Sequence, residues 1–185
     1  LHGQNNLLGY CENGSNRVFS VDKCLLVDDK INEILEILNK MSFNESIDEA
    51  VVRCSNDSSE VMVSLKGNIS DYSLLRNVVD TLVINDEVTY IGNNCFSYCP
   101  NLRSITLPAG LEVVRYDPFI GSDNLEEVYF RSLLPPTIEI GGIDQDQYAN
   151  LTIYVPEQSL DLYLSDPSWA PLNKYMEGYH YDDLE

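Results

Sequence analysis

The stretch VTYIGNNCFSYCPNLRSITLP, residues 88–108, decides the fold, because the chain after it repeats the same apolar pattern 23 residues later. The matched apolar residues are Val88 with Leu111, Ile91 with Val114, and Phe96 with Phe119. Asn101 and Asn124 coincide at the same interval. A pattern that recurs at a fixed interval of this size indicates a stack of similar structural units.

A short alternating run of apolar residues also recurs at this interval and continues into four units. The aligned sets are Val79, Leu82 and Ile84; Leu102, Ile105 and Leu107; Leu125, Val128 and Phe130; and Tyr148, Leu151 and Ile153. Alternation is typical of a strand with one buried face. Since no single unit can bury its apolar face alone, the units are expected to stack and share a parallel sheet.

The alternation also predicts which side chains face outward from that sheet. One predicted outward row is Thr81, Ser104, Glu127 and Thr152, and the next is Val83, Thr106, Tyr129 and Tyr154. Of the twelve tyrosines, only Tyr129 and Tyr154 are expected to be displayed. Exposed tyrosine offers a large apolar face and a polar tip, which suits ligand recognition.

Residues 88–108 resemble the BspA-like leucine-rich repeats found in surface proteins of gut and oral anaerobic bacteria. Ile91-Gly92, Cys95-Phe96, Cys99 and the run from Leu102 to Pro108 carry this resemblance. The stretch VPEQSLDLYLSDPSWAPL, residues 155–172, resembles the family's C-terminal cap, with a strand, a short helix and a Trp. Residues 64–84 resemble the hairpin that often opens such arrays.

Three departures from the family pattern indicate a short, degenerate array of about three to four repeats. Arg115 stands where Gly is usual, and Asp117-Pro118 precedes Phe119. The third unit has Gly141-Gly142-Ile143 in place of its closing Phe.

Residues 1–59 show no repeat. Ile31, Ile34, Leu35, Leu38 and Met41 follow helical spacing after a capping Asp28 or Asp29. Arg17–Val27, Ala50–Cys54 and Glu60–Leu65 are predicted as strands. This part is either an α/β cap on the first repeat or a separate small domain.

The resulting fold prediction is an α/β leucine-rich-repeat solenoid, right-handed, with short parallel strands and a 23-residue period. Residues 1–59 form the N-terminal α/β cap or small domain, residues 60–156 the repeats, and residues 157–185 the C-terminal cap with Trp169.

The chain is strongly acidic, with 30 acidic and 11 basic residues and a formal net charge of −19. Such a surface repels nucleic acid and anionic lipid, so neither is an expected partner. No apolar run reaches the roughly 20 residues of a membrane-spanning helix. The first residue is Leu1, and a signal or lipoprotein leader is presumed to have been removed.

The sequence predicts no metal site and no cofactor. Cys95 and Cys99 are spaced as half a metal site, but they align with Pro118 and Ser122, which suits small buried residues better. Asp144 and Asp146 faintly resemble a calcium loop, yet the EF-hand spacing fails. A disulfide among Cys11, Cys24 and Cys54 is left open.

No catalytic motif stands out, and the chain is not expected to be an enzyme. The two histidines, His2 and His180, lie near the ends of the chain, away from any packed nucleophile. No Gly-rich phosphate loop and no G-x-S-x-G turn occurs.

The resemblance implies adhesion or ligand capture at the cell surface or outside the cell. The expected partner is a protein or glycan, including host extracellular proteins, with basic or apolar contact groups. The predicted binding residues are Thr106, Glu127, Tyr129, Thr152 and Tyr154. The alternative is a structural spacer or cap within a larger envelope protein or assembly.

Overall fold

The computed structural model describes residues 2–4, 7–11, 18–20, 29–42, 46–54, 61–68, 75–84, 86, 88–139 and 150–180. Several predicted features lie outside these residues. They are Cys24, the capping Asp28, Gly141-Gly142-Ile143, the acidic pair Asp144 and Asp146, and Tyr148.

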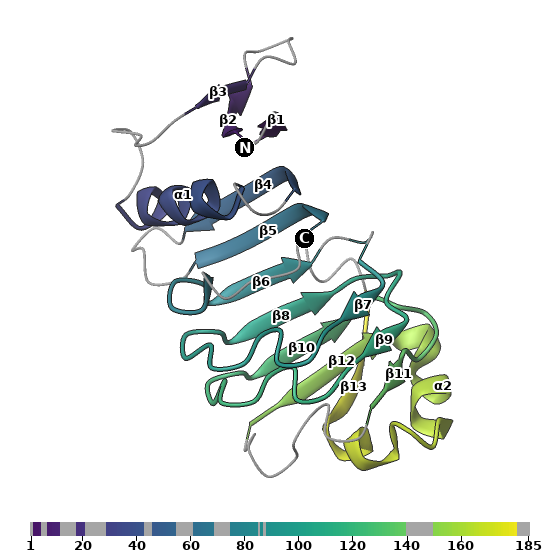
Figure 1. The fold of residues 1–185 in the computed structure, drawn as a ribbon. Helices are drawn as coiled ribbons and strands as arrows, with labels where there is room; N and C mark the ends of the chain where they lie inside the picture. Colours follow the sequence, from purple (N-terminus) through teal and green to yellow (C-terminus); the bar gives the residue numbers. More distant parts are fainter. Residues whose placement is uncertain are drawn as a thin grey trace.

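Within the described part of the chain, ten strands form one sheet in the order β13-β12-β10-β8-β6-β5-β4-β1-β2-β3 (Figure 1). Neighbours from β5 to β13 pair in parallel, whereas β5, β4, β1, β2 and β3 pair antiparallel. The strands are β1 (His2–Gln4), β2 (Leu7–Cys11), β3 (Val18–Ser20), β4 (Ser46–Cys54), β5 (Val61–Asn68), β6 (Thr81–Ile84), β8 (Ser104–Leu107), β10 (Glu127–Phe130), β12 (Thr152–Pro156) and β13 (Met176–Tyr179).

A second, smaller parallel sheet holds β7 (Tyr90–Ile91), β9 (Val113–Val114) and β11 (Thr137–Ile138). These strands follow β6, β8 and β10 along the chain, so each unit contributes one strand to each sheet (Figure 1). The chain therefore coils between two sheets of short parallel strands. The parallel pairing predicted from the repeat is confirmed.

The predicted 23-residue interval holds for the first pairs and fails for the last one. Leu82 pairs with Ile105 and Ile105 with Val128, but Val128 pairs with Ile153, not with Leu151. The last interval is thus two residues longer. Because side chains alternate with a period of two, an insertion of two residues keeps Leu151 and Ile153 on the buried side. The residues of the predicted outward rows stay on the outward face for the same reason.

The prediction of a hairpin over residues 64–84 is wrong. β5 pairs in parallel with β6, and the antiparallel partner of β5 is β4. The connection from β5 to β6 cannot be a tight turn, because a parallel pair needs a crossover. Its described part contributes Leu75, Val78 and Val79 to the core.

The N-terminal helix α1 (Asp29–Ser42) follows the predicted spacing, with Ile34, Leu35 and Leu38 buried. It contacts β4 and lies at the N-terminal end of the sheet (Figure 1). On its exposed side Lys40 pairs with Glu36 at 2.9 Å, and this contact lowers the pKa of the Glu36 carboxyl.

The interior of the coil is a continuous row of stacked apolar side chains. Phe96 and Phe119 are each 1% exposed, and their rings stack with centroids 5.8 Å apart, as predicted. Beyond them, Phe130 meets Tyr163 and Trp169 in tilted and edge contacts. Tyr163 comes from α2 (Leu160–Ser165), which follows η2 (Glu157–Ser159), and Trp169 precedes η3 (Ala170–Tyr175).

Turn geometry repeats with the same interval and accounts for one departure from the family pattern. Asn94 and Asp117, 23 residues apart, both have positive φ, at 55° and 48°. Asn and Asp tolerate this left-handed conformation better than other residues with a side chain. Tyr98 and Gly121 form a second such pair. Asp117 before Pro118 therefore preserves the turn of the preceding unit.

Side-chain hydrogen bonds also link successive turns. The amide of Asn101 donates to the carbonyl of Asn77, and that of Asn124 donates to the carbonyl of Pro100, both at 2.6 Å. The coincidence of Asn101 with Asn124 in the sequence thus reflects one structural role. Such bonds fix the spacing between turns, since each satisfies a backbone carbonyl of the previous unit.

Candidate binding surface

The five predicted binding residues lie side by side on three neighbouring strands. Glu127 on β10 pairs with Thr152 on β12, and Tyr129 pairs with both Tyr154 and Thr106. The residues between them on β10 and β12, such as Val128 and Ile153, are fully buried. The five residues therefore share the outward face of the large sheet.

Tyrosine rings dominate this face. The rings of Tyr129 and Tyr154 stack with centroids 4.5 Å apart and an interplanar angle of 12°. Tyr179, on β13, is only 8% exposed and supports the more accessible rings from below: it meets Tyr129 edge-on at 5.5 Å, and its hydroxyl donates to the carbonyl of Phe130 at 3.3 Å. We call Tyr129, Tyr154 and Tyr179 the tyrosine cluster. Stacked and edge-on contacts of this kind hold the rings in fixed positions.

The five residues differ in how much of each is accessible. Glu127, Tyr129, Thr152 and Tyr154 are half-buried. Thr106 is only 9% exposed, so the expectation that it is displayed is wrong. Its short side chain lies beside the much larger Tyr129 in the strand register. The accessible part of the predicted surface is therefore confined to β10 and β12.

Carboxylates surround the cluster and affect its titration. Burial, followed by the charge of Glu127, raises the pKa of Tyr129 well above its ordinary value. Burial, Glu127 and Glu177 also raise the pKa of Tyr154. Both phenols are therefore neutral at physiological pH and can donate hydrogen bonds. The face combines aromatic surface with negative charge, which favours apolar and cationic contact groups.

Sequence reasoning missed Tyr179. The segment Met176–Tyr179 lies within the expected C-terminal cap and forms β13, a further parallel strand beside β12 that was not predicted. Gly178 interrupts the apolar alternation that identified the other strands. The one available signal was the 23-residue interval itself, which relates Tyr154 to Glu177.

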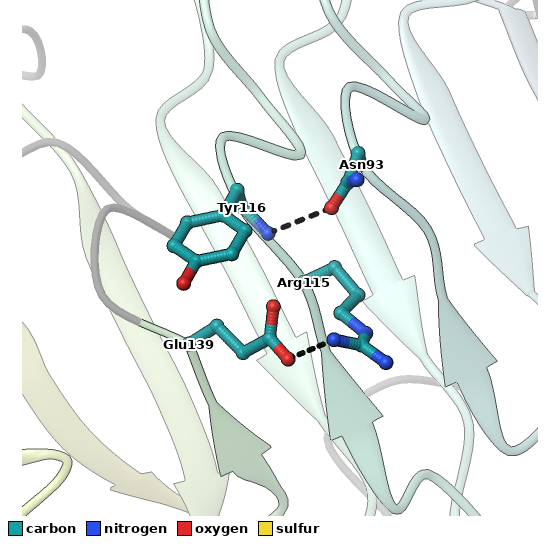
Figure 2. Close-up of polar contacts among 4 residues, drawn as sticks. All are labelled: Asn93, Arg115, Tyr116 and Glu139. Atoms are coloured by element: carbon teal, nitrogen blue, oxygen red, sulfur yellow. Dashed lines mark hydrogen bonds and ion pairs between the residues drawn. The ribbon is translucent and has the colours of Figure 1, made fainter.

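The expectation that only Tyr129 and Tyr154 are displayed is also wrong. Tyr90, Tyr98 and Tyr116 are 49%, 65% and 51% exposed, more than Tyr129 and Tyr154, which are half-buried. Tyr90 belongs to β7, and Tyr116 follows β9 with its backbone N–H donating to the Asn93 side chain at 3.3 Å (Figure 2).

Arg115, which replaces the glycine of the family pattern, lies among these tyrosines. Its guanidinium is 5.5 Å from the centroid of the Tyr90 ring and pairs with the carboxylate of Glu139 (Figure 2). The equivalent position one turn earlier is Gly92, where an added Cβ would lie 3.6 Å from the ring of Tyr90. Arg115 thus links three consecutive turns across the second sheet.

The two cysteines of the repeat lie in structural positions. Cys99 is 7% exposed, its backbone N–H donates to the hydroxyl of Ser122 at 2.9 Å, and burial raises the pKa of its thiol. Ser122 in turn donates to the carbonyl of Phe96. Cys95 is half-buried. Across the described residues, no three His, Cys, Asp or Glu side chains gather in a metal-binding group.

The comparisons with known proteins point to one family. A family model described as a BspA type leucine-rich repeat region, in six copies, matches residues 17–140. The match thus starts inside the segment expected to hold no repeat and ends before β12, and its six copies exceed the three to four repeats predicted from the sequence. No curated protein matches the chain. Among the described residues, no helix has the length and apolar character needed to cross a membrane.

Proposed function

Since the chain belongs to the BspA type leucine-rich repeat family, we propose that it is a non-catalytic binding module whose ligand docks on β10 and β12. Leucine-rich repeat modules are typically protein-binding domains that recognise partners on extended, rigid surfaces. The ligand is a protein with basic or apolar contact groups. A glycan is the other class of ligand that an aromatic face accepts.

The observation that carries this proposal is the tyrosine cluster flanked by Glu127. Aromatic side chains with fixed rings lose little entropy on binding, so they are efficient contact residues. Tyr129 and Tyr154 each have a neutral hydroxyl and a carboxylate nearby. A lysine or arginine of the partner can therefore lie against a ring and near Glu127 at once.

The proposed architecture is a right-handed solenoid with the repeats over residues 60–156. In this proposal residues 1–59 form an α/β cap or a small domain, and residues 157–185 form the C-terminal cap. Repeat arrays need such ends, because a terminal repeat otherwise exposes its apolar interior. Trp169 and Tyr163, both fully buried against the last full turn, support this role for the C-terminal segment.

The proposed location is the cell surface or the extracellular space, which the family suggests. The rival function is a spacer or cap within a larger envelope assembly. A spacer needs no accessible recognition residues. Aromatic cross-strand pairs can stabilise its sheet without binding any ligand. The stacking of Tyr129 on Tyr154 is compatible with both functions, so binding has to be measured.

The test is a cross-linking pull-down with the purified chain, followed by binding measurements on the partner that is identified. The Tyr129→Ser, Tyr154→Ser double variant is expected to lose the partner. The matched control is Tyr90→Ser, Tyr116→Ser, which removes two exposed tyrosines, one in β7 and one just after β9, and is expected to bind normally. Undiminished binding by a folded Tyr129→Ser, Tyr154→Ser protein would exclude this face.

A further inference from the structure

A groove crosses the carboxyl ends of the parallel strands, away from the midpoints where Tyr129 and Tyr154 lie. It consists of two adjoining hollows of about 600 and 520 Å³. Both hollows are lined by Ala109 after β8 and by Arg131 and Leu133 after β10. One continues to Pro156 and Tyr179 at the ends of β12 and β13, and the other continues along residues 132–136. We call this feature the strand-end groove.

Two adjacent leucines in this groove are unusually exposed. Leu133 and Leu134 are 53% and 72% exposed, more than the exposed leucines of α2, Leu162 at 50% and Leu164 at 38%. Pro135 and Pro136 follow them and add to the apolar lining. Contiguous apolar surface of this kind on a soluble protein marks an interaction site more often than chance.

The loop that displays these leucines is held rigidly from below. The hydroxyl of Tyr163 donates to the carbonyl of Ser132 at 2.8 Å and lies 2.7 Å from the Ser132 hydroxyl. The indole N–H of Trp169 donates to the carbonyl of Pro136 at 2.9 Å. Both anchors are fully buried, and they hold the backbone on either side of the two leucines. A rigid loop of this kind lowers the entropy cost of binding.

The charged residues that line the groove indicate which kind of ligand it can bind. Arg131 lines the groove, and its guanidinium pairs with the carboxylate of Asp86 at 2.9 Å. The positive charge of Arg131 is therefore already neutralised. Asp86 is fixed as well, since it accepts the backbone N–H of Ala109 at 2.9 Å. Glu112 and Glu157, both exposed, lie along the two hollows. The rim is therefore acidic, in a chain with a net charge of −19.

We propose that the strand-end groove binds an extended apolar peptide segment of a partner protein that carries lysine or arginine on its flanks. The apolar residues contact Leu133, Leu134 and the neighbouring prolines, and the basic flanks pair with Glu112 and Glu157. The proposal does not depend on the tyrosine cluster being a binding site, because the proposed contact residues lie outside the cluster; Tyr179, which lines one end of the groove, is not one of them.

The test is panning of a phage-displayed library of random 12-residue peptides against the whole chain. Enriched peptides are expected to combine apolar residues with Lys or Arg flanks, and their binding is expected to weaken as salt is added. The Leu133→Ser, Leu134→Ser double variant is expected to lose about tenfold or more in affinity for the synthetic peptides. The matched control is Leu162→Ser, Leu164→Ser, which alters exposed leucines of α2 that do not line the groove.

The Glu112→Lys, Glu157→Lys variant provides a second, independent readout. It leaves the leucines in place and is expected to reverse the preference, so that peptides with acidic flanks bind better than those with basic flanks. No enriched peptide, enriched peptides with acidic flanks on the unaltered chain, or equal binding by the Leu133→Ser, Leu134→Ser protein would each overturn the proposal. A similar loss in the control variant would overturn it too.

Discussion

Replacement of Phe119 by alanine tests the stacking of the repeat units. Phe119 is 1% exposed, and its ring stacks on Phe96 of the previous unit with centroids 5.8 Å apart. Removal of a fully buried Phe costs about 3–5 kcal/mol, which includes the cavity left behind. Part of this, about 0.5–1.5 kcal/mol, is the contact between the two rings.

That loss is large compared with the roughly 5–15 kcal/mol that stabilises a typical domain. In a repeat array each unit is stabilised by its neighbours, so the loss at Phe119 is expected to reach the units on both sides. Phe119→Leu keeps most of the volume and is expected to cost clearly less.

The assay is urea unfolding followed by circular dichroism, with the midpoint and slope fitted for each variant. The control is Tyr116→Ala, which removes a ring of similar size that is 51% exposed. Its cost is expected to stay within about 0.5 kcal/mol, as for other surface positions. Equal midpoints for Phe119→Ala and Tyr116→Ala would refute the stacked interior.

Three further predictions concern the turns, the thiol and the buried phenols. Gly121→Ala is expected to destabilise the fold by about 1–2 kcal/mol, because the backbone φ of Gly121 is +73° and the added Cβ would lie 2.5 Å from the ring of Tyr98. An unchanged melting temperature would contradict this. Cys99, being buried with a raised pKa, is expected to react with iodoacetamide only as fast as the protein unfolds, and rapid labelling of the native chain would be inconsistent with its position. Because burial raises the pKa of Tyr129 and Tyr163 in the folded state, their stabilisation is complete below the ordinary tyrosine pKa of about 10 and is lost as pH rises beyond it. Tyr163→Phe is therefore expected to flatten the fall in unfolding free energy above about pH 10, and an unaltered alkaline slope would exclude this cause.

The parts of the fold that could be predicted from the sequence are those at which the structure accepts few residue types. Phe96 and Phe119 occupy the same place in successive turns, and their interior position excludes polar residues. Asn101 and Asn124 recur because each satisfies a backbone carbonyl of the preceding turn. Such positions repeat in the sequence because they repeat in the structure.

The failures have equally local causes. The interval between β10 and β12 is two residues longer than predicted, and the sequence pattern does not reveal this. An insertion of two residues leaves the alternation of buried side chains at Leu151 and Ile153 unchanged. β13 was missed since Gly178 breaks its apolar pattern. The hairpin over residues 64–84 was inferred from resemblance, and strand direction is not encoded in the alternation of side chains.

The candidate surface was predictable in register and not in accessibility. Strand parity places Glu127, Tyr129, Thr152 and Tyr154 on one face, and their pairing across β10 and β12 agrees with the predicted rows. Exposure depends on the size of neighbouring side chains, which is why Thr106 beside Tyr129 is nearly covered. The exposure of Tyr90 was not predicted, since a strand of two residues carries almost no pattern, and Tyr98 and Tyr116 lie outside the strands.

The most direct test of the proposed function is the dissociation constant of the identified partner, measured by calorimetry on matched variants. Residues at the centre of a binding surface typically contribute about 2 kcal/mol or more, so Tyr129→Ser, Tyr154→Ser is expected to weaken binding by about thirtyfold or more. Tyr129→Phe, Tyr154→Phe keeps the stacked rings and is expected to lose far less. A Tyr129→Ser, Tyr154→Ser protein that melts as a folded chain and binds with an unchanged dissociation constant would contradict the account.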